Sequence, residues 1–192
     1  MKKLGAVVAR FQPIHLGHMF LIEKALKECE KVVVVVSSGD KSRTKRNPIK
    51  VSDRMAMVIE SIEMLPMVDR VRVSVISLQD WSDEKDNDNK DWGNFVYYNI
   101  MRVAGSDLQA IGPDLSIYYS DDPSIIKEWF TPRLAERVTI VEVNRSEVLG
   151  GLSATKVREA IAVGDKSYVR KYCPKPVLQR FDDLSIDIRR SV

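Results

Sequence analysis

The chain has 192 residues, of which 30 are Lys or Arg and 27 are Asp or Glu, and its formal net charge is +3. An apolar fraction of 44% and a charged fraction of 30% are typical of globular proteins and exclude wholesale disorder. The apolar run at 32–36 is far shorter than the roughly 20 residues of a membrane helix, and two cysteines make neither a disulfide framework nor a zinc cluster. We therefore expect a cytoplasmic protein whose charge is too small to indicate a nucleic-acid partner.

Strands and helices alternate in the predicted order of elements. The first strand is expected at 3–11, before Pro13. The β-branched run at 32–36 is apolar on both faces, as in a central strand of a parallel sheet. Between these strands, apolar residues recur at helical spacing over 19–29, which completes a βαβ unit with a right-handed crossover.

The same alternation continues along the chain. Further strands are predicted at 71–78, 115–119 and 138–143, and helices at 53–65, 91–104, 123–130 and 153–163, with Ser52 and Ser153 as N-caps. This pattern predicts a doubly wound α/β fold, with ligands at the carboxyl ends of its parallel strands. Two long loops, 39–51 and 79–90, are expected at those ends. We expect residues 1–164 to form the main domain, and 165–192 a helical extension that belongs to it or contacts another subunit.

The first strand leads into Arg10-Phe11-Gln12-Pro13-Ile14-His15-Leu16-Gly17-His18, which holds both histidines of the chain. They stand three residues apart at a helix start, where backbone N–H groups and the helix dipole favour an anion. Imidazoles in this position are suited to donate hydrogen bonds to phosphate oxygens. The alternative is that one histidine packs in the core and the other lies at the surface. The segment offers no carboxylate or thiol as a third ligand, which argues against a metal site.

A second basic segment, Gly151-Leu152-Ser153-Ala154-Thr155-Lys156-Val157-Arg158, opens the helix predicted at 153–163. Lys156 and Arg158 in the first turns of a helix oppose its dipole, which is unfavourable unless an anion is bound. A capped helix with basic residues is also common without any ligand. Together with the histidine segment, it indicates two helix N-termini that converge on a polyphosphate.

These segments resemble the signatures of a known superfamily. Residues 11–18 resemble the H-x-G-H signature of the Rossmann-like nucleotidyltransferases, and 153–158 resemble their I-S-x-T-x-[IV]-R motif. Arg10-Phe11-Gln12-Pro13 resembles the G-R-F-Q-P opening of nicotinamide mononucleotide (NMN) adenylyltransferases of the archaeal and NMN adenylyltransferase–Nudix types. Their N-P-F-T-x-x-E-R and D…N-x-x-W stretches are similar to Asn47-Pro48 with Asp53-Arg54, and to Asp80 with Asn89-Lys90-Asp91-Trp92.

The resemblance implies adenylyl transfer, in which the phosphate of NMN attacks the α-phosphorus of ATP and pyrophosphate leaves. Catalysis is then positioning and charge neutralisation, and the implied catalytic residues are His15, His18, Arg10 and Arg158. Mg²⁺ is expected on the ATP phosphates, without protein ligands of its own. The implied ATP-binding residues are Arg10, Phe11, Gln12, His15, His18, Ser153, Thr155, Lys156 and Arg158. The implied NMN-binding residues are Arg46, Asn47, Asp80, Asn89, Trp92 and Trp81, with Trp92 stacked on the pyridine ring and Trp81 as its rival.

Departures from the family pattern concern the acceptor. Ala9 stands where the family usually has Gly, Ile49-Lys50 replaces Phe-Thr, and 120–123 replaces a Gly-His-Asp-Lys type segment. One alternative is another phosphorylated acceptor, such as phosphopantetheine, flavin mononucleotide or a phosphorylated alcohol. A second is a nucleotide-sensing module without catalysis. We expect small-molecule ligands, no nucleic-acid or membrane partner, and a homo-oligomer.

Overall fold

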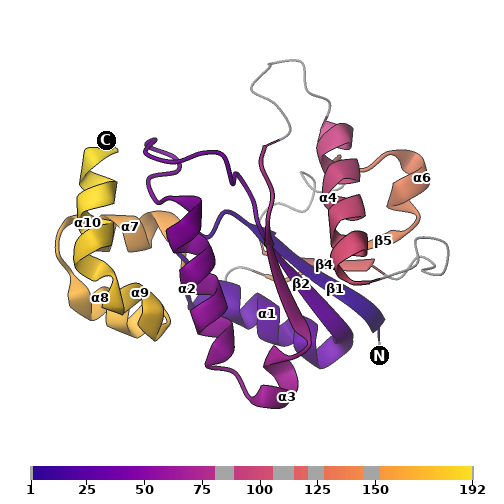
Figure 1. Cartoon of the computed structure of the whole chain (residues 1–192), viewed down its shortest axis with the longest axis horizontal. Coiled ribbons are helices and arrows are strands. Elements are labelled where there is room, and N and C mark those ends of the chain that lie inside the picture. Colours follow the sequence, from indigo (N-terminus) through magenta and orange to yellow (C-terminus); the bar gives the residue numbers. More distant parts are fainter. Residues whose placement is uncertain (1, 81–88, 106–114, 121–127, 145–151, 192) are drawn as a thin grey trace.

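The structure is a computed structural model that describes residues 2–80, 89–105, 115–120, 128–144 and 152–191. A parallel sheet runs through the molecule with helices on both faces (Figure 1). Within the described residues, its strands are β1 (Lys2–Ala9), β2 (Cys29–Val36), β3 (Val73–Ser77), β4 (Leu115–Tyr119) and β5 (Val138–Glu142). The predicted α/β fold is therefore confirmed.

Two groups of helices cover the sheet. One face is covered by α1 (Leu16–Glu28), α2 (Val51–Glu63) and the C-terminal helices, and the other by α4 (Asn89–Val103) and α6 (Pro132–Ala135). The remaining helices of the described chain are α3 (Met67–Arg70), α7 (Ala154–Ala162), α8 (Lys166–Tyr172), α9 (Lys175–Gln179) and α10 (Phe181–Arg190). In Figure 1, α7–α10 lie at one end of the molecule and α4 with α6 at the other.

The strand order fixes where a ligand site can form. The strands follow one another as β3-β2-β1-β4-β5, so the chain builds outward from β1 in one direction and then returns to its other side. The order thus reverses between β1 and β4, which pair from Leu4 with Leu115 to Val7 with Tyr118. Crevices outside the carboxyl ends of the strands at such a switch point are where α/β sheets bind ligands.

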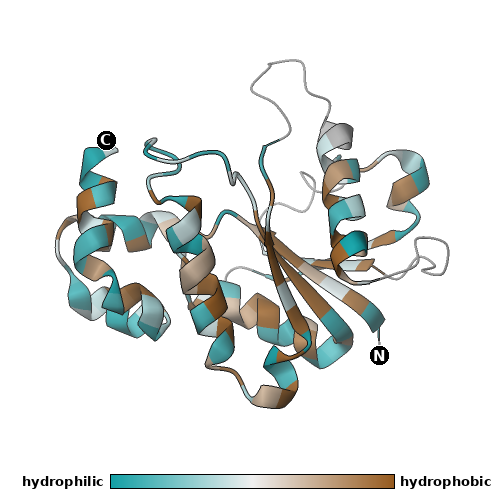
Figure 2. Ribbon diagram, in the orientation of Figure 1, coloured by the Kyte–Doolittle hydropathy of each residue, from teal (hydrophilic) through white to brown (hydrophobic). Residues whose placement is uncertain are grey.

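The valine run of β2 contributes to both cores, as its sequence predicts. Val32, Val34 and Val36 belong to the core under α1, whereas Val33 and Val35 belong to the core under α4. Because successive side chains point to opposite faces of a sheet, a strand covered on both sides is apolar at every position. Figure 2 shows the same apolar band along the central strands, with hydrophilic residues toward the outside of the helices.

Several element boundaries differ from the sequence prediction. The strand predicted over 3–11 ends at Ala9, because Phe11 has φ of 51° and leaves the extended conformation. Ser52 is not an N-cap: α2 is preceded by Lys50, whose carbonyl accepts the N–H of Arg54. Helix α3 occupies the segment before β3, where no helix is predicted. Most of the helix predicted at 123–130 lies outside the described residues.

The residues after Gly164 pack on the main body. Val169, Phe181 and Leu184 belong to the same buried cluster as α1 and α2. Arg180 donates from Nη1 to Glu60 of α2 at 2.7 Å, and Arg189 donates to the carbonyl of Ala162. The extension therefore contributes to the core under α1. A search of the described helices finds none with the length and apolarity of a membrane span.

We expect Val34→Ala to lower the free energy of unfolding by about 2 kcal/mol, because it removes two buried methyl groups and leaves a cavity between packed layers. Val34 is fully buried in β2, whereas Val163 is 80% exposed. The matched control Val163→Ala should change stability by less than about 0.5 kcal/mol. Urea titration followed by circular dichroism measures both, and equal effects of the two changes would contradict the burial of β2.

Candidate phosphate-binding active site

Both histidines lie at the junction of β1 and α1. His15 is the N-cap of α1, and His18 stands in the first turn of this helix. Their rings stack with 3.8 Å between centroids and 19° between planes, which confirms the expectation that they share one side of a helix start. The backbone N–H of His15 donates to Nδ1 of His18 at 3.3 Å. Since Nδ1 of His18 accepts, the neutral ring carries its proton on Nε2.

Phe11 supports the histidine pair. Its φ of 51° lies in the left-handed region, which residues with a side chain rarely adopt. The side chain is buried, and its ring centroid lies 4.7 Å from that of His18. This packing orients the His18 ring, so Phe11 shapes the site through its neighbour. A contact between Phe11 and ATP stays a prediction.

Gln12 holds three segments of the chain together. Its side-chain Nε2 donates to the carbonyl of Ile49 at 3.1 Å, and its Oε1 accepts the N–H of Ile49 at 3.0 Å. Its own carbonyl accepts Nη1 of Arg158 at 3.0 Å. The buried amide of Gln12 is therefore used to fix the loop before α2, whereas its predicted contact with ATP stays untested.

The start of α7 meets the same turn. Ser153 is its N-cap, as predicted, and accepts the N–H of Lys156 at 3.3 Å. Arg158 donates from Nη2 to Oγ1 of Thr155 at 3.2 Å and from Nη1 to Gln12. The hydrogen bond to Gln12 joins residues 146 positions apart and brings the basic first turns of α7 beside the turn that leads into α1.

Three arginines concentrate positive charge at this place. Burial lowers the pKa of Arg10, and the nearby charges of Arg46 and Arg158 lower it further, while Asp80 acts in the opposite direction. Burial also lowers the pKa of Arg158. Nη1 of Arg10 is buried and has no hydrogen-bond partner among the described residues. Clustered, partly desolvated guanidinium groups are unfavourable alone and favourable around a polyanion.

A residue without a predicted role, Arg54, fixes the backbone around this cluster. It is fully buried, and Nη1 donates to the carbonyls of Arg10 and Ser37 at 2.7 and 2.8 Å. Nη2 donates to the carbonyl of Ser38 at 2.8 Å. Burial lowers the pKa of Arg54 to about 10, so it stays charged at neutral pH. Its spacing to the buried Met57 and Val58 places an arginine on the apolar face of a helix, a signal that could have identified it.

The loop between β2 and α2 is tied to the end of β3. Ser38 donates to Oδ1 of Asp80 at 3.0 Å, and the N–H of Asp80 donates to Oδ1 of Asp40 at 2.8 Å. In the same loop, Asn47 is buried and its Oδ1 has no hydrogen-bond partner among the described residues. Arg46 beside it is exposed. Arg46 and Asn47 thus lie in this loop, and Asp80 is hydrogen-bonded to it from the end of β3.

The predicted aromatic part of the acceptor site lies on α4. Trp92 is half-buried, and its ring contacts Trp129 edge-to-face with 6.2 Å between centroids and Phe95 with 6.0 Å. The described ring contacts of Trp92 are thus with core aromatics rather than with the arginine cluster. Asn89 begins α4, but its side chain and the whole of Trp81 lie outside the described structure.

The fold and these contacts agree with a known family. A family model described as cytidylyltransferase-like matches residues 6–160, which include the histidine junction and the start of α7. The chain belongs to the cytidylyltransferase-like family. Helices α8–α10 lie beyond the matched residues.

Curated relatives of this cytidylyltransferase-like chain are archaeal enzymes. It is 26% identical over 173 residues to the nicotinamide-nucleotide adenylyltransferase of Thermoplasma volcanium, covering 90% of this chain and 82% of the relative. It is 27% identical over 180 residues to the enzyme of the same name from Thermococcus sibiricus, covering 94% and 83%.

A solved structure has the same fold. It is a bifunctional NMN adenylyltransferase/ADP ribose pyrophosphatase from Francisella tularensis, complexed with AMP and a manganese ion. The TM-score is 0.71 at 21% identity, over 98% of the cytidylyltransferase-like chain and 52% of the Francisella chain. The present chain therefore spans about half the length of that protein.

We expect Arg54→Met to lower the free energy of unfolding by about 3 kcal/mol, because it leaves several buried carbonyls without a donor. Arg54→Lys should lose less, because a lysine keeps the charge but cannot form the guanidinium fork. Arg170→Met is the matched control, since Arg170 is exposed on α8. Urea titration of the three variants measures their order of stability. Equal stability of the Arg54 and Arg170 variants would contradict the stabilising role of the Arg54 hydrogen bonds.

Proposed function

We propose that this chain transfers the AMP part of ATP to NMN, which forms NAD and releases pyrophosphate. The observation that carries the proposal is the buried, unpartnered Nη1 of Arg10, whose guanidinium group lies near the charges of Arg46 and Arg158. The stacked histidines follow it in the same turn. This arrangement suits a triphosphate lying across two helix N-termini. The names of the archaeal relatives support NMN as the acceptor.

The chemistry asks for charge stabilisation more than for covalent work. A phosphate oxygen of NMN forms a bond to the α-phosphorus of ATP as the bond to the β-phosphate oxygen breaks, and negative charge develops on the leaving pyrophosphate. Arg10, Arg158 and the Nε2 proton of His18 are positioned to stabilise that charge. His15 stacks on His18 and limits the orientation of its ring.

ATP enters this reaction as its Mg²⁺ complex. Mg²⁺ would be held mainly by the phosphates of the nucleotide, where it would neutralise part of their negative charge. The described residues contain no group of three or more His, Cys, Asp or Glu side chains arranged around a metal. The first turn of α7, with Ser153, Thr155 and Lys156, is suited to the β- and γ-phosphates.

The acceptor NMN binds beside the loop between β2 and α2. Arg46 binds the NMN phosphate, since its charge acts on Arg10 at the reaction centre. The unsatisfied Oδ1 of Asn47 and the carboxylate of Asp80 accept hydrogen bonds from the ribose or the nicotinamide amide. Trp92 stacks on the pyridine ring, and Asn89 and Trp81 stay predicted NMN-binding residues.

The second candidate function is nucleotidyl transfer to a phosphorylated acceptor other than NMN. It is favoured by the described contacts of Trp92, whose ring packs on Trp129 and Phe95. Phosphopantetheine, flavin mononucleotide and phosphorylated alcohols need the same phosphate-binding cluster but no pyridine stack.

A homo-oligomer in the cytoplasm completes the proposal. Exposed apolar side chains gather at the α2–α3 end of the molecule, which supports a contact between subunits. They are Met64, Met67, Val68 and Val71, each at least 59% exposed.

Incubation with ATP, Mg²⁺ and single acceptors tests the function directly. We expect pyrophosphate and NAD with NMN, and little product with phosphopantetheine, flavin mononucleotide or glycerol phosphate. Turnover with one of these but not with NMN would contradict NMN as the acceptor and retain the reaction class. Release of no pyrophosphate with any acceptor would contradict catalysis and favour a sensing role.

We expect His18→Ala to lower kcat by about 100-fold or more, because it removes a hydrogen-bond donor to the developing charge. Lys27→Ala is the control, since Lys27 is exposed in the last turn of α1. Steady-state kinetics measure both variants, and thermal unfolding checks that each is folded. Near-normal turnover of the His18 variant would mean that the phosphate site lies elsewhere.

A further inference from the structure

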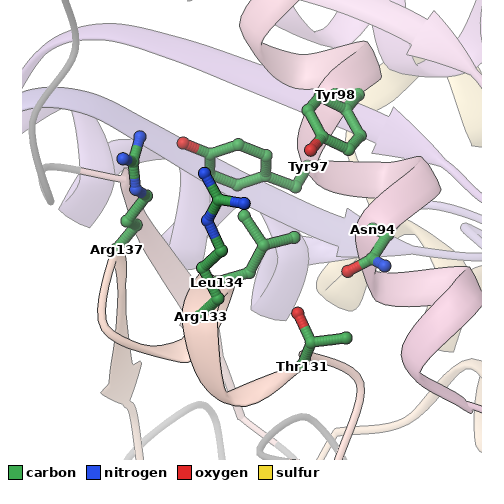
Figure 3. A pocket seen from close by; sticks show the side chains of 7 residues that line it. All are labelled: Asn94, Tyr97, Tyr98, Thr131, Arg133, Leu134 and Arg137. Atoms are coloured by element: carbon green, nitrogen blue, oxygen red, sulfur yellow. The ribbon is translucent and has the colours of Figure 1, made fainter.

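Helices α4 and α6 line a partly open cavity of about 560 Å³ (Figure 3). It shares no residue with the candidate phosphate site, here called the phosphate-binding cluster, which consists of His15, His18, Arg10, Arg46 and Arg158. Its walls are polar and aromatic, with side chains from both helices and their flanks: Asn94, Tyr97, Tyr98, Thr131, Arg133 and Arg137. Volumes of this size are typical of sites for small organic ligands.

Two arginines form one wall of this cavity. In Figure 3, the guanidinium groups of Arg133 and Arg137 lie on the side to which the hydroxyl of Tyr97 points. Neither arginine forms an ion pair or a side-chain hydrogen bond with any residue in the described part of the chain. Two unpaired guanidinium groups on one wall match a phosphomonoester, which carries about −1.5 to −2 charges at neutral pH and several acceptor oxygens.

The opposite wall offers an acceptor. Oδ1 of Asn94 is buried and has no hydrogen-bond partner among the described residues. Its amide lies across the cavity from the arginines, with the hydroxyl of Thr131 below it in Figure 3. This oxygen is closed off from the cavity, so the hydroxyl of Thr131 is the group on this wall that is suited to accept from an N–H or O–H group of a ligand.

Two tyrosine rings lie between these polar ends. Tyr97 is 4% exposed and Tyr98 is 54% exposed, and their rings meet edge-to-face with 5.6 Å between centroids. The partly open face of Tyr98 is suited to stack on a planar ring. The cavity therefore has a place for a phosphate, a ring and a hydrogen-bond donor.

The walls are held in place before any ligand binds. A Cβ on Gly93 would lie 1.8 Å from the carbonyl oxygen of Trp129, so α4 packs directly on the backbone that leads into α6. Leu134 at the floor of the cavity is buried in the core under α4. A preformed site loses little conformational entropy when it binds.

We propose that this cavity is a second ligand site, which binds a small organic phosphate carrying a planar ring with a hydrogen-bond donor. The paired arginines hold the phosphate, Tyr98 stacks on the ring, and the hydroxyl of Thr131 accepts from the donor. The proposal does not depend on adenylyl transfer, because no residue proposed to bind ATP or NMN lines this cavity.

AMP is the test probe, with inorganic phosphate and adenosine as its separate parts. Protein with ¹³C-labelled tyrosine and histidine rings reports on both sites by NMR, and Tyr98→Phe identifies the Tyr98 signal. We expect a saturable shift of the Tyr98 signal with AMP, and at least tenfold weaker binding of phosphate or adenosine alone.

The double variant Arg133→Gln/Arg137→Gln should weaken the Tyr98 response at least tenfold and leave the His18 response to AMP unchanged. Arg170→Gln/Arg190→Gln is the matched control, which removes two exposed charges from α8 and α10. It should leave both responses unchanged. Thermal unfolding should show both double variants folded.

Three results would overturn the proposal. The first is the absence of a saturable shift of the Tyr98 signal with AMP. The second is that the two double variants bind AMP with equal affinity, as measured by the Tyr98 signal. The third is loss of the Tyr98 response in His18→Ala, since that shift would then be transmitted from the phosphate-binding cluster.

Discussion

The guanidinium group of Arg54 is the interaction on which the site depends. It joins the carboxyl ends of β1 and β2 through the carbonyls of Arg10, Ser37 and Ser38. Further side-chain bonds extend this network, because Gln12 holds Ile49 and Arg158 holds Gln12. Each bond fixes backbone rather than another side chain. The polar side chains at the switch point therefore stand on a rigid frame although most of them come from loops.

The positive charges of the arginine cluster destabilise the protein when no anion is bound. Arg10 and Arg158 are both partly desolvated, and Arg10 also faces the charge of Arg46. The overall charge of +3 hides this cluster because acidic residues elsewhere nearly balance it. Anything anionic that binds between the two helix N-termini relieves that repulsion and stabilises the folded state through linkage.

Local signals in the sequence were sufficient for the sheet and for part of the site. The valine run of β2 predicts a strand buried on both faces, and the spacing of His15 and His18 predicts their shared place at a helix start. The bonds from Gln12 to Ile49 and from Arg158 to Gln12 link positions 37 and 146 residues apart, so no periodicity reveals them. The prediction of Ser52 as an N-cap was wrong because α2 already begins at Val51. The cavity between α4 and α6 likewise depends on packing that local patterns do not encode.

The strand order has a consequence for synthesis of the protein. β1, α1 and β2 emerge first, but the partner of β1 on its other side, β4, follows only after α2, α3, β3 and α4. Arg158 emerges later still and is 146 residues from its acceptor on Gln12. A nascent chain therefore presents the histidine junction well before it has the second helix N-terminus. The two helix N-termini therefore come together only after the chain has been synthesised at least as far as α7.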